Sequence, residues 1–160
     1  MNYASTPVFM RSEVRAEIVK RIRDAVPKGE NIAVSRGFPG SALQERHIYL
    51  GTPTGDVSNE VFTGQLLTYD DQFECTVVIA DATGGMSSDV AEQSTQDLGN
   101  LVYTALIDAS LGNLVMLNGA GFMIEALIGR VDGPHAEIRV EGYIGLMTID
   151  LMFHTRTKGK

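Results

Sequence analysis

Residues 73–80 read Phe73-Glu-Cys-Thr-Val-Val-Ile-Ala80, and every odd position among them is apolar. The even positions begin with a glutamate and a threonine. Successive side chains of a β-strand point to opposite faces of its sheet, so this alternation predicts a half-buried strand. Other elements of the chain must cover the apolar face of this strand, and together they define the fold.

A first helix is predicted before this strand. Thr6 and Pro7 form a helix start, because a hydroxyl can cap the free amides and proline fits the first turn. The helix is expected to end before Pro27. Its apolar residues recur every four positions and are Met10, Val14, Ile18 and Ile22. This spacing gives the helix one apolar face.

A second helix is predicted after the strand. It is expected to begin near Ser88 or Asp89, because Asp89-x-x-Glu92 resembles a capping box, and to end at Gly112. Its apolar stripe comprises Val90, Leu98, Leu101, Val102, Ala105 and Leu106.

Two further strand pairs are predicted. One has strands at 32–34 and 47–50 around a turn at 37–40, and the other has strands at 123–130 and 136–154 around a turn at 131–134. The apolar residues of the last strand occupy even positions from Ile138 to Leu146 and odd positions from Met147 to Phe153. Either Gly142 or Gly145 marks a bulge, or a neighbour buries one half of this strand on the other face.

This order of elements predicts a single α+β domain over residues 1–160, in which an antiparallel sheet carries two helices on one face. A chain of 160 residues with 44% apolar and 21% charged residues fits one globular domain. The apolar runs are too short to span a membrane, and the N-terminus lacks the pattern of a signal peptide. We therefore expect an intracellular protein without a membrane partner.

Residues 51–72 form the least regular segment, and a connection of this length is unusual in a compact domain. We expect either a floppy excursion or, as we favour, an extended loop or hairpin arm that finds its partners only in an assembly. The apolar residues of this arm are Val61, Phe62, Leu66 and Leu67.

Charge is strongly segregated along the chain. Residues 47–129 contain eleven Asp and Glu and no Lys or Arg, whereas residues 1–46 contain eight basic and five acidic residues. Surfaces of unlike charge favour docking in a fixed orientation, and a head-to-tail contact can close into a ring. The candidate interface pairs a basic helix face with acids of a neighbour, although that face could also be merely solvated. Its candidate residues are Arg15, Lys20, Arg21, Arg23, Asp70, Asp71, Glu92 and Asp97.

Chemical motifs are weak. The three histidines lie in separate predicted elements, residues 81–89 lack the alternating ligands of a calcium loop, and Gly119-Ala-Gly121 is an isolated G-x-G. Asp70-Asp71 is expected to lie in a hairpin turn. We therefore expect no catalytic residues, no metal and no cofactor, and thus no enzyme.

The chain resembles the tail terminator (tail-to-head joining) proteins of long-tailed bacteriophages. The resemblance covers nearly the whole chain, through the order of elements and several local patterns. These patterns are the opening helix at 10–25, the segment 47–51, the strand 73–80, the long helix that ends at 101–107 after a Gly-rich turn, and the closing strand pair. The family has no diagnostic catalytic or ligand motif, so the resemblance assigns no functional residue.

The resemblance implies a structural virion protein of the tail or neck, assembled in the cytoplasm of a bacterial host. Such proteins form a homo-hexameric ring that caps the tail tube, with the tail tube protein on one rim and the head connector or neck protein on the other. DNA passes through the lumen without specific binding. Two alternatives stay open: a phage neck or head-completion protein, and a small soluble ligand-binding or enzymatic domain, a dimer with a pocket near residues 119–122.

Overall fold

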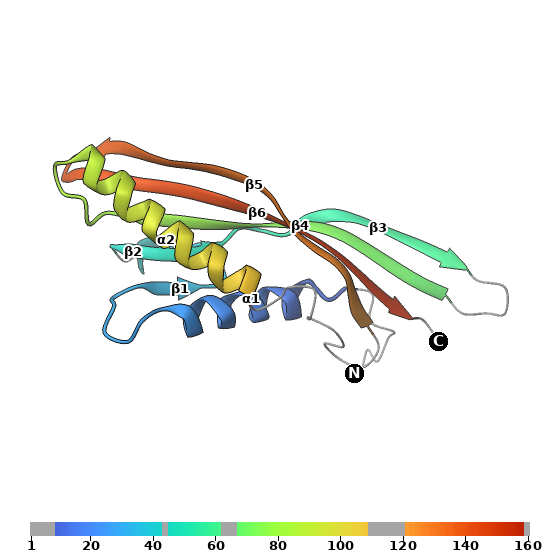
Figure 1. The fold of residues 1–160 in the computed structure, drawn as a ribbon. Coiled ribbons are helices and arrows are strands. Elements are labelled where there is room, and N and C mark those ends of the chain that lie inside the picture. The colour runs from blue at the N-terminus through green and yellow to red at the C-terminus, as the bar shows by residue number, and fades with distance from the viewer. Residues whose placement is uncertain (1–8, 43–44, 62–66, 109–120, 159–160) are drawn as a thin grey trace.

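The computed structural model describes residues 9–42, 45–61, 67–108 and 121–158, and these build two helices and one sheet (Figure 1). This confirms the α+β prediction. In chain order the elements are α1 (Arg11–Ala25), β1 (Ala33–Ser35), the short 3-10 helix η1 (Gly40–Ala42), β2 (Arg46–Leu50), β3 (Thr54–Val61), β4 (Leu67–Asp81), α2 (Ser88–Asp108), β5 (Gly121–Arg139) and β6 (Gly142–Lys158).

The sheet is organised around β4. Its strand order is β1-β2-β4-β6-β5, and β3 pairs with the part of β4 that β2 does not reach. All pairings are antiparallel except that of β1 with β2, where Ala33 lies opposite His47. The two short strands predicted around 37–40 therefore exist, but the chain between them does not form a simple hairpin.

Alternation along β4 follows the predicted pattern. Phe73, Cys75, Val77 and Ile79 are at most 2% exposed, whereas Glu74 on the other face is exposed. β6 pairs with β4 from Gly145 to Lys158 without a register shift, so its odd-numbered side chains extend the same apolar face. These buried residues of β6 include Ile149, Leu151 and Phe153.

Both helices contribute to the one core that covers this apolar face. The predicted stripe of α1 is buried, with Met10, Val14, Ile18 and Ile22 fully inaccessible. Thr6 and Pro7 lie outside the described residues.

The stripe of α2 is only partly as predicted. Leu98, Val102 and Leu106 are buried, but Val90 is 54% exposed and Ala91 is buried instead. The helix begins at Ser88, as expected, but the amide of Val90 donates to the Ser87 hydroxyl at 3.3 Å, so Ser87, not Asp89, provides the cap. Gly112, the expected helix end, lies outside the described residues.

The turn between the last two strands was wrongly predicted. It lies at Val140–Glu141, whereas residues 131–134 are inside β5, where the pairing with β6 shifts between Asp132 and His135. No bulge occurs at Gly142 or Gly145 in β6. The even-numbered apolar residues Ile144 and Leu146 instead lie on the face of the sheet opposite to the helices.

The segment 51–72, expected either as an irregular excursion or as an extended loop or hairpin arm, contains a strand. Residues 54–61 form β3 and pair in register with residues 67–74 of β4, so the segment contributes a hairpin to the sheet (Figure 1). Val61 lies opposite Leu67 at the end of this hairpin, and Phe62 and Leu66 lie outside the described residues. The β3 side chains from Thr54 to Ser58 are all exposed, so β3 itself adds little to the core.

Close approach fixes α2 against β6. A Cβ at Gly145 would overlap the Thr95 hydroxyl and lie 2.6 Å from the backbone oxygen of Ala91, so only glycine leaves room for the helix there. At the same end of the sheet, the amide of Tyr143 donates to the carbonyl of Gly85 at 2.7 Å. The hairpin tip and the loop before α2 are thereby held together.

We predict that Gly145→Ala lowers the free energy of unfolding by about 1–3 kcal/mol, because the added methyl group overpacks the contact with α2. Urea unfolding measures the difference. Gly37→Ala is the matched control, because a Cβ at Gly37 meets no heavy atom within 4 Å. Equal stability of the two variants would contradict the close packing of α2 on β6.

Candidate assembly surfaces

A hollow of about 370 Å³ lies on the helix-free face of the sheet, between strands β3, β4, β5 and β6. Four of its six residues from β4 and β6 are even-numbered and lie on the face away from the core, namely Gln72, Glu74, Met152 and His154; the other two are Phe73 and Phe153. Three exposed carboxylates stand around it: Asp56, Glu74 and Glu125. Leu127 and Met152 supply apolar surface and are 49% and 44% exposed. We call this hollow the acidic trough.

The carboxylates of the acidic trough form no ion pair with the described residues, although, besides the hydrogen bonds of Asp71, the charge of Asp56 contributes to raising the pKa of Arg11. Three like charges gathered over one hollow raise the negative potential there and favour the approach of a cation. The trough is therefore a surface that prefers a basic partner.

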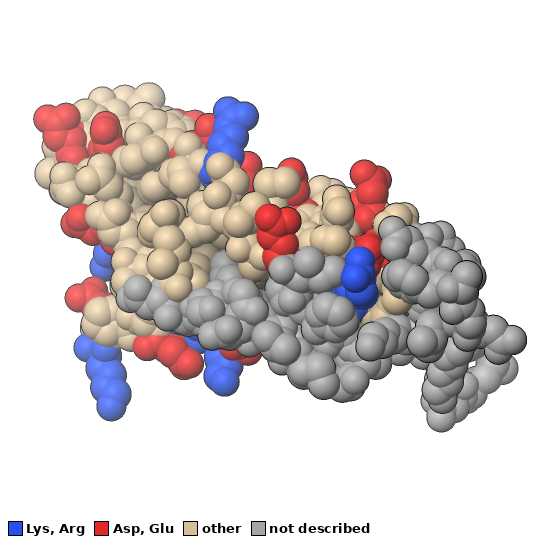
Figure 2. All heavy atoms as spheres, turned by 45° about the vertical axis from the view of Figure 1, so that its right-hand side comes forward, with Lys and Arg blue, Asp and Glu red and all other residues tan. Residues whose placement is uncertain are grey.

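Uncompensated positive charge lies on the other side of the molecule, around α1. Lys20, Arg23 and Lys28 are exposed, and within the described part of the chain none of them pairs with a carboxylate. In Figure 2 several Lys and Arg side chains protrude from the lower part of the molecule with Asp and Glu side chains among them, and others protrude at the top and right of centre. We call these three residues the basic edge.

Two of the four predicted basic residues serve the fold itself. Arg15 is half-buried and donates to the carbonyls of Arg36 and Gly51, at 2.5 and 3.3 Å. Arg21 pairs with Glu17 one helical turn away at 3.1 Å. The predicted basic face is thus reduced to Lys20 and Arg23, and Arg23 also donates to the carbonyl of Val34 at 2.8 Å.

Asp70 and Asp71 were wrongly predicted, both as turn residues and as acids available to a neighbour. They lie within β4 and point to opposite faces, and each accepts two hydrogen bonds from one arginine of the same chain. Arg156 binds Asp70 at 2.7 and 2.9 Å, and Arg11 binds Asp71 at 2.8 and 2.7 Å. With the Asp71 side chain fully buried and that of Asp70 9% exposed, neither can meet a second molecule.

In these two ion pairs the pKa of Asp70 is lowered and the pKa of Arg11 is raised. The Arg156 guanidinium lowers the pKa of Asp70, and its hydrogen bonds outweigh the effect of burial. Asp71 raises the pKa of Arg11 through its hydrogen bonds. Both interactions favour the charged forms, so at neutral pH the two ion pairs stabilise the fold through charge-assisted hydrogen bonds.

Glu92 and Asp97 are exposed on α2, as an interface would require. Neither pairs with a basic residue of the described chain, and Asp97 accepts a hydrogen bond from Gln93 at 3.0 Å. They lie on the helix side of the sheet together with α1, however, and not at the acidic trough. The structure thus brings none of the predicted acids to this hollow.

The residues of the trough were missed because their signal is weak in the sequence. Glu74 occupies an even position in a strand whose odd positions are apolar, so the sequence alone indicates that its side chain faces away from the core. Asp56 and Glu125 lie on other strands, and only the registers of β3 with β4 and of β5 with β6 bring them to the same hollow.

Among the described residues, no three His, Cys, Asp or Glu side chains are grouped so that they could hold a metal ion. The buried carboxylate of Asp81 accepts hydrogen bonds from the amide of Thr83 at 2.9 Å and from the Ser94 hydroxyl, and it thereby ties β4 to α2. Burial raises the pKa of the Cys75 thiol, which disfavours a reactive thiolate.

Of the two helices described, neither combines the length and the apolar composition that a membrane span requires. Comparison with family models gives no match to this chain, and a search of curated proteins gives no similar sequence. The assignment of a function therefore depends on the surfaces of the molecule.

The Asp70–Arg156 pair predicts a specific response to acid. Because Arg156 holds the pKa of Asp70 below 3.8, the unfolded chain takes up this proton at a higher pH than the folded protein. The stabilisation is therefore complete above about pH 3.8 and is lost as pH falls through the lower, folded-state pKa. We predict that Asp70→Asn costs roughly 1.5–3 kcal/mol at pH 7 and that the deficit shrinks in acid.

Urea unfolding between pH 7 and pH 3 tests this prediction. Glu92→Gln is the matched control, because it removes an exposed carboxylate that has no ion pair, and it should leave the curve unchanged. A deficit of Asp70→Asn that stays constant down to pH 3 would contradict the assigned pair.

Proposed function

We propose that this protein is a structural subunit of a bacteriophage virion, a tail terminator that forms a homo-hexameric ring between tail tube and head connector. One observation carries the proposal: three carboxylates without an ion pair gather at the hollow on the helix-free face, whereas the exposed cations Lys20, Arg23 and Lys28 lie around α1, on the side that also carries Glu92 and Asp97. The acidic trough is on the helix-free face, and the basic edge belongs to the helix that covers the other face.

Unpaired carboxylates on one face and exposed cations around α1 favour a particular kind of assembly. A contact between the two unlike surfaces is head-to-tail, and such a contact closes into a ring when the rotation between subunits permits. A two-fold dimer formed through only one of these faces would instead bring that face against its own copy, and like charges would meet. The resemblance to tail terminators supplies the expected number of subunits, six.

The net charge suits a ring that surrounds DNA. Each chain has a net charge of −7, so a ring of six chains has a total net charge of −42. A polyanion in the lumen of such a ring is repelled and can pass without being retained. The protein acts in this proposal as a non-enzymatic joint, with a tail tube protein on one rim and a connector or neck protein on the other.

Native mass measurement tests the proposal. We expect a particle of six times the 17.3 kDa chain mass at low salt, alone or on addition of tail tubes. Association should weaken as salt rises, because the Debye length falls from about 10 Å at 0.1 M to about 3 Å at 1 M. A protein that stays monomeric at low salt, both alone and with tail tubes, would overturn the proposal.

A further inference from the structure

The acidic trough has the chemistry of a receptor for one long basic side chain. Its rim carries three carboxylates, and Leu127 and Met152 offer exposed apolar surface between them. A lysine or arginine buries its aliphatic stem on apolar surface and keeps its charged end among polar groups. Neither the carboxylates alone nor the apolar floor alone would select such a side chain, but the combination does.

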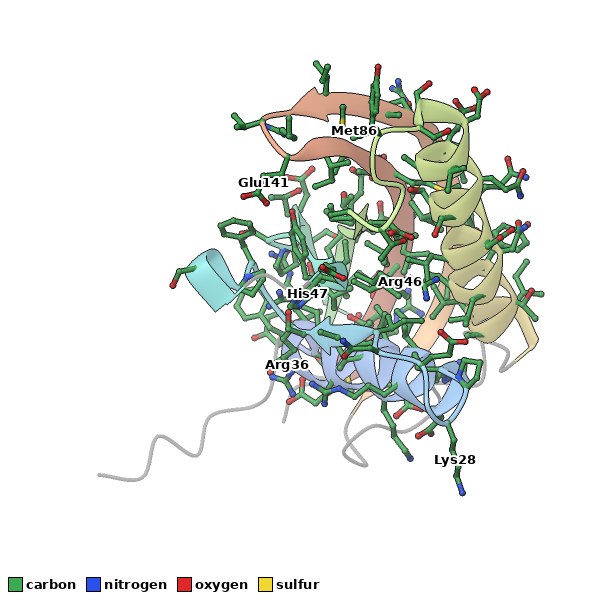
Figure 3. All side chains as sticks on the ribbon, turned by 90° about the vertical axis from the view of Figure 1, so that its left-hand side faces the viewer. Lys28, Arg36, Arg46, His47, Met86 and Glu141 are labelled. Carbon is green, nitrogen blue, oxygen red and sulfur yellow. The ribbon has the colours of Figure 1, made fainter. Side chains whose placement is uncertain are left out.

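The chain carries a protruding lysine of this kind at the end of α1. Residues 27–29 form a tight turn in which the amide of Glu30 donates to the carbonyl of Pro27 at 3.1 Å, and Gly29 adopts a φ of 90°. Proline and the hydrogen bond restrict this turn, so little conformational freedom is lost when it docks. Figure 3 shows Lys28 pointing away from the body of the molecule.

Lys28 and the trough of one subunit cannot satisfy each other. α1 packs on the odd-numbered, buried face of β4, whereas the trough is lined by even-numbered residues such as Glu74 and Met152 on the opposite face. Each subunit therefore has an unfilled trough and, at the turn, a lysine without an ion pair among the described residues. In a ring, the neighbour on one side supplies the lysine for the trough, and the neighbour on the other side supplies the trough for the lysine.

We propose that Lys28, on the turn at 27–29, inserts into the acidic trough of the next copy of this chain. Lys20 and Arg23 flank the contact from the exposed side of α1. This assignment rests on the proposed ring and names the surfaces that build it: every copy donates one lysine and receives one. The contact has a single direction, so it repeats around the ring and leaves no copy unpaired when the ring closes.

Charge reversal on each surface tests the contact. Lys28→Glu alters only the donor, and the double variant Glu74→Lys, Glu125→Lys alters only the receptor. Because these side chains are exposed, both proteins should fold with unchanged thermal unfolding. Each variant alone should form rings at least about tenfold more weakly than the wild type, since like charges then meet at every contact.

Mixing the two variants provides the decisive measurement. In an equal mixture, the intact trough of the first variant receives the intact lysine of the second, and the reversed donor meets the reversed receptor with attraction. Rings of alternating composition should therefore form again, visible by native mass. The double variant Glu92→Lys, Asp97→Lys is the matched control: it makes the same charge change on α2 and should assemble like the wild type.

The outcomes separate the two proposals. Three outcomes would overturn the assigned contact while leaving the ring itself in place. Both reversal variants could form rings as well as the wild type does, the mixture could stay unassembled, or the control variant could fail to assemble as the receptor variant does. Rings that persist while the receptor variant loses binding to tail tubes would assign the trough to a tail protein, which also overturns the contact. Absence of wild-type rings would overturn both proposals.

Discussion

The alternation of side chains along β4 is the constraint on which the rest of the structure depends. β4 is paired on both sides, with β6 along one edge and with β2 and β3 along the other, so its side chains can only leave through the two faces of the sheet. The odd residues from Phe73 to Ile79 enter the core beneath the helices, and the even residues point to the other face, where Gln72 and Glu74 are exposed. Asp70 and Asp71 illustrate this alternation, because their adjacent carboxylates bind different arginines on opposite faces of the sheet.

Those parts of the fold that follow from local periodicity could be predicted from the sequence. The strand at 73–80 and the four-residue repeat of α1 are of this kind, because burial of one face imposes the period directly. β3 could not be predicted, because its exposed polar residues acquire strand geometry from β4 and not from their own composition. Residues 131–134 have the composition of a turn, yet they form an irregularity within β5. The pairing of β5 with β6 determines that the chain continues as a strand there instead of turning.

The candidate surfaces were predictable in kind but not in detail. Segregation of charge along the sequence predicted a basic side around α1, and in the structure Lys20, Arg23 and Lys28 are exposed there. It could not separate acids that are neutralised within the chain from acids that remain unpaired, because the partners of Asp70 and Asp71 lie 86 and 60 residues away. Glu74 and Glu125 carry no such partner in the described chain, and they became candidates only once strand register placed them around one hollow.

The central claim is that unlike faces of neighbouring subunits meet head-to-tail. Single-particle imaging of the assembled protein at low salt tests it most directly, because the image shows both the symmetry and the faces in contact. The account predicts a six-fold ring in which the α1 side of each subunit lies against the helix-free sheet face of the next. A two-fold particle with identical faces in contact, or a ring whose helix-free faces all remain uncovered, would contradict it.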